Sequence, residues 1–155
     1  MGSEMCIRDR YRSKLASTSI EAMCHWFICL FYADLIMRLL FVCVGNSCRS
    51  QMAEGIARSL GHDAASAGTH PASQVSANAL KVLESKGIST EGLYPKLVDD
   101  IDWQSYDMVI SMGCGVSCPM IRIDADWELE DPVGQSLEVF EACAETIEAN
   151  IRKLE

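Results

Sequence analysis

The residues with the clearest chemistry lie in one short run, Cys43-Val44-Gly45-Asn46-Ser47-Cys48-Arg49-Ser50. Its small residues let successive backbone N–H groups, from Val44 to Cys48 and at Ser50, point at the oxygens of a tetrahedral anion. Arg49 offers that anion two parallel donors and a permanent charge, which Lys cannot match in geometry. The same N–H groups favour the thiolate of Cys43, and the Ser50 hydroxyl can donate a further hydrogen bond to the sulfur. The run therefore predicts an oxyanion-binding loop in which Cys43 is the nucleophile.

The segments on either side would place this loop between a strand and a helix. Leu39-Leu40-Phe41-Val42 is an unbroken apolar run, typical of a parallel strand that is buried on both faces. After the loop, apolar residues recur at helical spacing, and Gly61 is expected to end the helix. These residues are Met52, Ile56, Ala57 and Leu60. The alternative, that Cys43 and Cys48 are merely buried small residues, leaves the Gly-Asn turn, the arginine and the serine unexplained.

The rest of the chain alternates predicted helices and strands. Residues 75–86 form an amphipathic helix that Gly87 ends, residues 107–112 form a buried strand, and a long helix runs from residue 135 to the C-terminus. Such alternation implies an α/β fold, with one parallel sheet, helices on both faces and catalytic loops at the carboxyl ends of the strands. No repeat or low-complexity linker interrupts the pattern, so we expect one domain.

A second pair of thiols, Cys114 and Cys118, follows the predicted strand 107–112 in a Gly-containing loop. An α/β sheet builds its active site at this edge, and a spacing of four permits a disulfide, so the two cysteines look like a redox pair. The alternative is that both are buried core cysteines. Cys143, on the flank of the last helix, is expected to be inert. We expect no metal, because no closely spaced histidine pair follows the loop cysteines and the loop arginine disfavours a cation.

Composition separates the first 36 residues from the rest. The chain has 155 residues and a net charge of −9, and residues 1–36 carry four basic and four acidic side chains. The excess negative charge therefore belongs to residues 37–155, and so acidic a domain argues against nucleic acid as a partner. Residues 1–36 are expected to be an artefactual, disordered or helical extension. Their first residues resemble translated sequencing-adapter text, and Met37 stands where a natural start would fall.

An apolar stretch at residues 22–33 faintly resembles a membrane segment. Asp34 and Arg38 interrupt it before the roughly twenty apolar residues that a transmembrane helix requires, so we expect no membrane association. The chain has eight cysteines, three of them in the first 36 residues, and the others lack the spacing of a secreted disulfide scaffold. We therefore expect a cytoplasmic protein whose cysteines are free thiols.

Three segments resemble the low-molecular-weight protein tyrosine phosphatase superfamily, and especially its arsenate reductase branch. They are CVGNSCRSQMAEG from Cys43 to Gly55, SAGT at residues 66–69 after the expected second strand, and DWELEDP at residues 126–132. The resemblance covers about residues 37–155 and implies a four-stranded parallel sheet. It also implies that Asp131 is the general acid for the leaving oxygen. Tyrosine phosphatases usually carry an aromatic residue after the Asp-Pro pair, whereas Val133 and Gly134 stand here, which favours a small inorganic substrate.

The arsenate reductase branch implies a function in arsenic detoxification, the reduction of arsenate to arsenite in three thiol steps. Cys43 attacks arsenate held by the loop and Arg49, while Asp131 protonates the departing hydroxide. Cys114 then attacks Cys43 and releases arsenite, and Cys118 attacks Cys114, which leaves a disulfide for thioredoxin or a similar reductant. No cofactor is implied, and phosphate and sulfate are expected to compete with arsenate.

Other interpretations stay open at this point. A low-molecular-weight tyrosine phosphatase would use Cys43, Arg49 and Asp131 in the same way. A mycothiol-dependent arsenate reductase would take its second thiol from a small molecule, and DWELEDPVGQ is similar to actinobacterial arsenate reductases, some of which do so. A non-enzymatic oxyanion sensor would lack an acid on the leaving-group side, which Asp131 argues against. Asp131 could also cap the last helix, with Pro132 at its first position.

Overall fold

The structure, a computed structural model, describes residues 36–113 and 121–155. Residues 36–155 form a compact unit of their own. The predicted redox pair, Cys114 and Cys118, and all but the last residue of the expected N-terminal extension lie outside the described residues. Among the helices of the described ranges, none is both long and apolar enough to cross a membrane.

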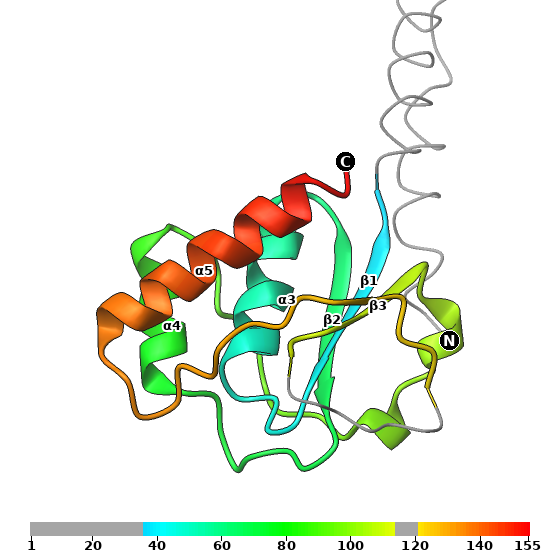
Figure 1. The fold of residues 1–155 in the computed structure, drawn as a ribbon, viewed down its shortest axis with the longest axis horizontal. Coiled ribbons are helices and arrows are strands. Elements are labelled where there is room, and N and C mark those ends of the chain that lie inside the picture. Colours follow the sequence, from blue (N-terminus) through cyan, green and yellow to red (C-terminus); the bar gives the residue numbers. More distant parts are fainter. Residues whose placement is uncertain (1–35, 114–120) are drawn as a thin grey trace, which may run out of the picture. The chain divides into compact units, whose positions relative to one another are not determined.

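Four parallel strands form the sheet, in the order β2-β1-β3-β4 (Figure 1). They are β1 (Arg38–Cys43), β2 (Asp63–Gly68), β3 (Met108–Ser111) and β4 (Ala125–Asp126). The apolar run predicted as a strand lies within β1, which is one of the two interior strands of the sheet. The residues of this run are fully buried. The last residue of β1, Cys43, pairs with Gly68 of β2, and Val42 pairs with Ser111 of β3. The predicted four-stranded parallel sheet is therefore confirmed.

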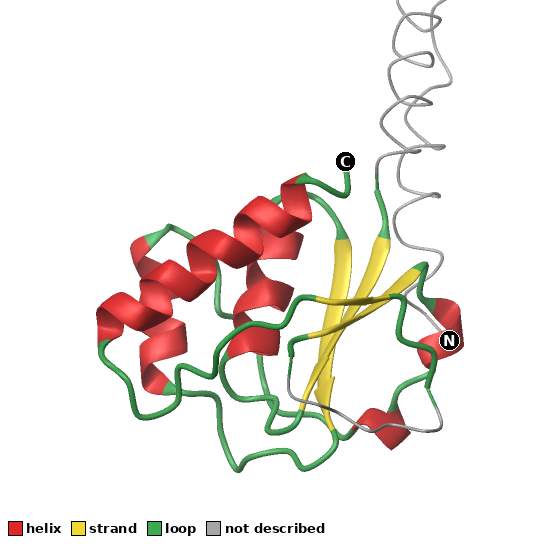
Figure 2. Cartoon of the chain, viewed as in Figure 1, coloured by secondary structure: helices red, strands yellow, loops and turns green. Residues whose placement is uncertain are grey.

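In the described ranges, three α-helices cover one face of the sheet (Figure 2). They are α3 (Arg49–Ser59), α4 (Ala77–Ser85) and α5 (Leu137–Arg152). Because side chains alternate along a strand, Leu39, Phe41 and Cys43 of β1 point to the same face. They pack there in one core with Met52 of α3 and Phe140 of α5. This core fixes the carboxyl end of β1 against the helix that follows the cysteine loop.

The opposite face of the sheet is covered by short 3₁₀ helices and connecting segments. Leu40 and Val42, the intervening residues of β1, pack there in a second core with Val98 and Trp103. Val98 belongs to η1 (Val98–Asp100), and Trp103 belongs to η2 (Trp103–Ser105). Helices thus lie on both faces of the sheet, as the alternating pattern predicts, but within the described ranges only the 3₁₀ type occurs on this side.

Two segment boundaries differ from the sequence-based expectations. Residues 66–68 belong to β2, because they pair in register with β1, and only Thr69 follows the strand. The last helix begins at Leu137 with Ser136 at its N-cap, so Asp131 does not cap it. Gly134 explains this start, because its φ of +76° is a left-handed conformation that an α-helix beginning at Pro132 could not contain.

Candidate active site

The predicted loop connects the carboxyl end of β1 to the N-terminus of α3, and a pocket of about 490 Å³ opens there. The pocket is lined by Cys43, Val44, Gly45, Ser47, Cys48, Arg49, Gly113, Asp131 and Val133. Gly113 follows β3, and the last two residues follow β4. Parallel strands bring their carboxyl ends to one edge, so three distant parts of the chain meet at this pocket. The N-terminus of α3 adds its partial positive charge on the same side.

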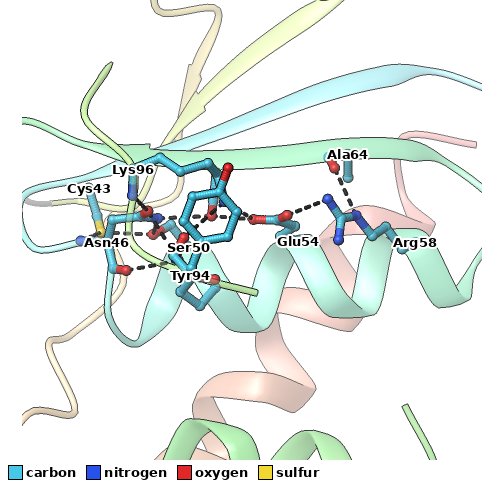
Figure 3. Close-up of polar contacts among 10 residues, drawn as sticks. Cys43, Asn46, Ser50, Glu54, Arg58, Ala64, Tyr94 and Lys96 are labelled. Atoms are coloured by element: carbon cyan, nitrogen blue, oxygen red, sulfur yellow. Dashed lines mark hydrogen bonds and ion pairs between the residues drawn. The ribbon is translucent and has the colours of Figure 1, made fainter. Parts of the chain in front are cut away.

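The Cys43 sulfur is buried and is hydrogen-bonded to the loop that surrounds it (Figure 3). The main-chain N–H of Asn46 donates to Sγ at 3.1 Å, and the Ser50 hydroxyl lies 2.9 Å from the sulfur. Asn46 has a φ of 45°, in the left-handed region that Asn tolerates better than most residues. This turn directs its N–H back to the sulfur. Donors placed in this way favour the thiolate over the thiol.

The carbonyl groups of the loop are held away from the pocket by the segment that follows β2. Main-chain N–H groups of residues 69–76 donate to four of these oxygens. The four bonds run from Thr69 to Cys43 (3.2 Å), from His70 to Val44 (2.9 Å), from Ala72 to Gly45 (2.8 Å) and from Ser76 to Ser47 (2.9 Å). With its carbonyls engaged there, the loop can turn N–H groups toward an anion.

Gly68 allows this close approach of β2 to the loop. A Cβ atom at Gly68 would lie 2.5 Å from the Val44 carbonyl oxygen and 2.9 Å from the Asn46 Cβ. Real Cβ atoms essentially never come so near, so any larger residue would displace the loop backbone. The glycine is therefore required by packing against the loop and not by an unusual φ.

Arg49 is buried and connects the loop to both of the other segments that line the pocket. Its Nη1 donates to the carbonyl oxygens of Met112 at 3.0 Å and Leu129 at 2.7 Å, while its Nη2 lies 3.2 Å from Asp131 Oδ2. The segments after β3 and β4 also touch directly, because a Cβ at Gly113 would lie only 2.6 Å from the Leu129 nitrogen. These contacts keep the guanidinium of Arg49 and the carboxylate of Asp131 side by side in the wall of the pocket.

Asp131 is the exposed partner of this ion pair, with 56% of its side chain accessible. Its other oxygen, Oδ1, accepts a hydrogen bond from the Val133 N–H at 3.2 Å, which orients the carboxylate. Val133 itself is 60% exposed at the pocket, where it offers a small apolar surface in place of an aromatic ring. A buried thiol, a guanidinium and a partly exposed carboxyl group thus share one pocket.

Residues 38–155 match the family described as low molecular weight phosphotyrosine protein phosphatase. The chain belongs to this family. Its relatives include the glutaredoxin arsenate reductase of Synechocystis sp., which is 40% identical over 124 residues, covering 76% of this chain and 95% of the relative. A putative arsenate reductase of Halobacterium salinarum is 32% identical and covers 77% of this chain and 91% of its own length.

Solved structures of the family superpose on the same part of the chain. An arsenate reductase in its phosphate-binding state gives a TM-score of 0.71 at 38% identity and covers 77% of this chain and 96% of that one. A low molecular weight protein tyrosine phosphatase from T. tengcongensis gives 0.62 at 33% identity and covers 76% and 97%. The fold is therefore shared by reductases and phosphatases of this family.

Within this family fold, the structure brings most of the sequence-predicted site residues together. Cys43, Arg49 and Asp131 line the pocket, along with four further residues of the loop. Asn46 and Ser50 are fully buried behind it and reach the sulfur from that side. Cys114 and Cys118 lie outside the described residues. Sequence analysis missed the carbonyl groups that hold Arg49, since a main-chain acceptor is present at every position and carries no sequence signal.

Two further cysteines of the described ranges, Cys48 and Cys143, are free thiols. Burial raises the pKa of Cys143 to about 11, so this thiol is almost entirely protonated near neutral pH. That agrees with the expectation that Cys143 is inert. In the described part of the chain, no group of three or more His, Cys, Asp or Glu side chains is arranged to hold a metal ion.

Proposed function

We propose that this chain reduces arsenate to arsenite and that Cys43 is its nucleophile. One observation carries the proposal: a buried thiol, a guanidinium and a carboxyl group converge on one pocket in a chain 40% identical to an arsenate reductase. The small apolar Val133 at the pocket further favours an inorganic oxyanion over a phenyl ester, because no aromatic side chain follows Pro132 to pack against the ring.

In the first step, the Cys43 thiolate attacks the arsenic atom and one As–O bond breaks. Loop N–H groups and Arg49 hold the remaining oxygens and stabilise the negative charge that develops on them. Asp131 donates a proton to the oxygen that leaves, which departs as water. The product is a covalent adduct between Cys43 and arsenic, still in the +5 state. Asp131 suits this role because its carboxyl group lines the same pocket and is accessible to solvent for reprotonation.

The next two steps supply two electrons from sulfur, and we assign them to Cys114 and Cys118. The Cys114 thiolate attacks the Cys43 sulfur, the S–As bond breaks with its electron pair on arsenic, and arsenite leaves in the +3 state. The Cys43–Cys114 disulfide is then attacked by Cys118, which frees Cys43 and leaves a Cys114–Cys118 disulfide. A dithiol protein of the thioredoxin type would reduce that disulfide. The support for this assignment is the sequence pattern, since both cysteines lie outside the described residues.

Two other activities remain candidates for the same pocket. Low molecular weight tyrosine phosphatases share the fold, and T. tengcongensis supplies an example at 33% identity. A reductase that uses mycothiol would need Cys43 but neither Cys114 nor Cys118. Phosphate and sulfate should compete with arsenate in every case, because they present similar tetrahedral oxygens to the loop. We further propose a cytoplasmic role in arsenic detoxification, since a reducing compartment keeps the required thiols free.

The deciding experiment measures two activities of the purified chain side by side. Arsenate-dependent oxidation of NADPH through thioredoxin and its reductase reports reduction, and hydrolysis of para-nitrophenyl phosphate reports phosphatase activity. Cys43→Ser should abolish both, because a hydroxyl is scarcely ionised in the position of the thiolate. Cys114→Ser should stop reduction and leave slow ester hydrolysis intact, and Cys143→Ser is the matched control that should change neither.

Each outcome discriminates between the candidates. Hydrolysis without arsenate-dependent oxidation by the native chain would contradict the reductase proposal and favour the phosphatase. Reduction that requires mycothiol and survives Cys114→Ser would remove Cys114 from the relay. Activity of either kind in Cys43→Ser would contradict the role of the nucleophile itself.

A further inference from the structure

A second cavity, of about 450 Å³, adjoins the pocket that holds Cys43. The two cavities share Ser47, Cys48 and Val133 in their walls. From there the second cavity extends between residues 72–78, which lead into α4, and residues 133–135, which precede α5. A ligand that is held in the pocket can therefore reach into this neighbouring cavity, which we term the side groove.

The side groove is lined by uncharged residues. Of the described residues in its lining, none is Asp, Glu, Lys, Arg or His, although 23% of the residues of the whole chain are charged. Arg49 and Asp131 line the pocket but not the groove. A charged group of a ligand would lose water in the groove without gaining a counter-ion. The part of a ligand that enters the groove is therefore expected to be neutral.

Polar side chains nevertheless surround the side groove. Its buried lining consists of Val75, Phe140 and Cys48. Hydroxyl and amide groups form the remaining walls, and they come from Ser47, Ser73, Gln74, Ser76, Asn78 and Gln135. The amide side chains of Gln74, Asn78 and Gln135 form no hydrogen bond with any residue that the structure describes. Their donors and acceptors are therefore available to a ligand.

Amide and hydroxyl side chains in this arrangement match a polyol. Each alcohol group of a polyol both donates and accepts hydrogen bonds, and so does each amide side chain. The volume of about 450 Å³ equals that of roughly fifteen water molecules, which leaves room for one sugar ring.

A peptide or an aromatic group would find less to bind in the groove. Peptides commonly pair with the main chain of an exposed strand edge, but the N–H groups of Ala72 and Ser76 already donate to loop carbonyls at 2.8 and 2.9 Å. Phe140 is the only aromatic residue among the described residues that line either cavity. Its side chain is almost completely buried, so it offers little ring surface for stacking.

We propose that the pocket and the side groove together bind phosphate monoesters of small neutral polyols, such as sugar phosphates, and that the chain hydrolyses them. The phosphate group lies in the loop against Arg49. The polyol lies in the groove, where it bonds to Gln74, Asn78 and Gln135. The inference rests on the proposed role of Cys43 as nucleophile, and it adds a hydrolytic activity that does not require arsenate reduction.

The hydrolysis consumes only water and needs no electron donor. The Cys43 thiolate attacks phosphorus, and the bond from phosphorus to the polyol oxygen breaks with its electron pair on that oxygen. Asp131 donates a proton, so that the polyol leaves as a neutral alcohol. Water then attacks phosphorus and returns a proton to Asp131, while the S–P bond breaks. Inorganic phosphate leaves, and the thiolate of Cys43 is restored.

Two esters that differ mainly in their hydroxyl groups test the binding. Glucose 6-phosphate and cyclohexylmethyl phosphate each carry a six-membered ring on a CH₂–O–phosphate group. Calorimetric titration of the full chain with Cys43→Ser, which cannot form the phosphorylated cysteine, gives Kd for both esters and for inorganic phosphate. We expect the sugar ester to bind about tenfold more tightly than the cyclohexyl ester, since two or three neutral hydrogen bonds suffice for that difference.

Variants of similar size assign this preference to the side groove. Gln74→Met, Asn78→Leu and Gln135→Met remove one amide each, and each is added to the Cys43→Ser chain. Each should weaken binding of the sugar ester about threefold or more and leave the other two ligands within about twofold. Gln104→Met is the matched control, because Gln104 is exposed in η2, which lies against the opposite face of the sheet. It should change none of the three affinities.

Release of inorganic phosphate from glucose 6-phosphate by the native chain tests the reaction. Asp131→Asn should stop this release and retain more of the hydrolysis of para-nitrophenyl phosphate, because nitrophenolate leaves without a proton whereas an aliphatic alkoxide does not. Binding of the sugar ester without any release by the native chain would contradict the hydrolytic step.

The remaining outcomes separate this inference from the proposed function. Equal affinities for the two esters would overturn the inference, and so would tighter binding of a phosphotyrosine peptide than of the sugar ester, which would assign the groove to peptides. Arsenate reduction by a chain without the sugar-ester preference would contradict the inference alone. The sugar-ester preference in a chain that does not reduce arsenate would support the inference and contradict the proposed function.

Discussion

Replacing Gly68 by alanine should damage catalysis far more than its size suggests. The new Cβ would lie 2.5 Å from the Val44 oxygen, 2.9 Å from the Asn46 Cβ and 3.0 Å from the Asn46 nitrogen. Two of these atoms are part of the loop backbone, and the Asn46 Cβ is bonded directly to it, so no flexible side chain can move aside. The loop must therefore retreat from β2 by about half an ångström or more, and it carries the Asn46 N–H with it.

The expected magnitudes follow from the two contacts that this retreat disturbs. Overpacking a well-filled site destabilises a protein by about 1–3 kcal/mol. Moving the Asn46 N–H away from Cys43 removes a hydrogen bond to a charged group, worth about 1.5–3 kcal/mol. If that bond serves the transition state, kcat/KM falls roughly ten- to hundredfold.

Gly87→Ala is the matched control for Gly68→Ala. Gly87 has a φ of +72°, and nothing lies within 4 Å of the position that an alanine Cβ would take there. Alanine at this position therefore costs about 1 kcal/mol of backbone strain and touches no part of the pocket. Both variants are compared by urea unfolding, by arsenate turnover and by para-nitrophenyl phosphate hydrolysis. Turnover by Gly68→Ala within about twofold of the native rate, at a measurable loss of stability, would refute the argument that this glycine positions the loop.

Three further predictions concern single groups or the chain terminus. Arg49→Lys should lower kcat/KM about a hundredfold or more, measured by steady-state kinetics, because a single ammonium nitrogen cannot reproduce the planar guanidinium, whose Nη1 binds two carbonyl groups while Nη2 faces the pocket side occupied by Asp131. Cys143 should stay unlabelled by iodoacetamide at pH 7 while Cys43 reacts, because the pKa of Cys143, about 11, leaves almost no thiolate there. Mass spectrometry of the labelled peptides measures both reactions, and similar labelling rates at the two cysteines would contradict the prediction. Deletion of residues 1–36 should leave the unfolding midpoint and arsenate turnover unchanged, and a truncated chain that fails to fold would show that the extension belongs to the domain.

The sequence predicted those parts of the fold that depend on local patterns. The apolar run before Cys43 predicted β1, and the periodic residues after Arg49 predicted α3, whose end is followed by Gly61 at a φ of +95°. The start of α5 was placed two residues too early, at Gln135 instead of Leu137, although Ser136 is a residue type that favours the N-cap position it occupies. The alternative in which Asp131 caps this helix is wrong, because Gly134 adopts a left-handed conformation that the sequence does not reveal.

The parts of the site that sequence analysis could not supply are contacts between main chains. The bonds from residues 69–76 to the loop carbonyls, and those from Arg49 to Met112 and Leu129, join segments that only the folded sheet brings together. Main-chain groups are the same for almost every residue type, so such contacts leave no residue pattern to detect. The side chains Cys43, Arg49 and Asp131 were predictable because their chemistry restricts the residue type.

The ion pair between Arg49 and Asp131 makes anion selection a matter of competition. Two carbonyl oxygens occupy Nη1 of Arg49, and the carboxylate of Asp131 lies against Nη2. A monoanion such as acetate that takes the place of Asp131 exchanges one carboxylate for another and gains little. A tetrahedral dianion adds a second charge and further oxygens for the loop N–H groups. The free energy that it gains on binding therefore exceeds what is lost when Asp131 leaves Arg49. Phosphate should accordingly inhibit at concentrations where acetate does not. The residue proposed to protonate the leaving oxygen would thus also exclude the abundant weak anions of the cell.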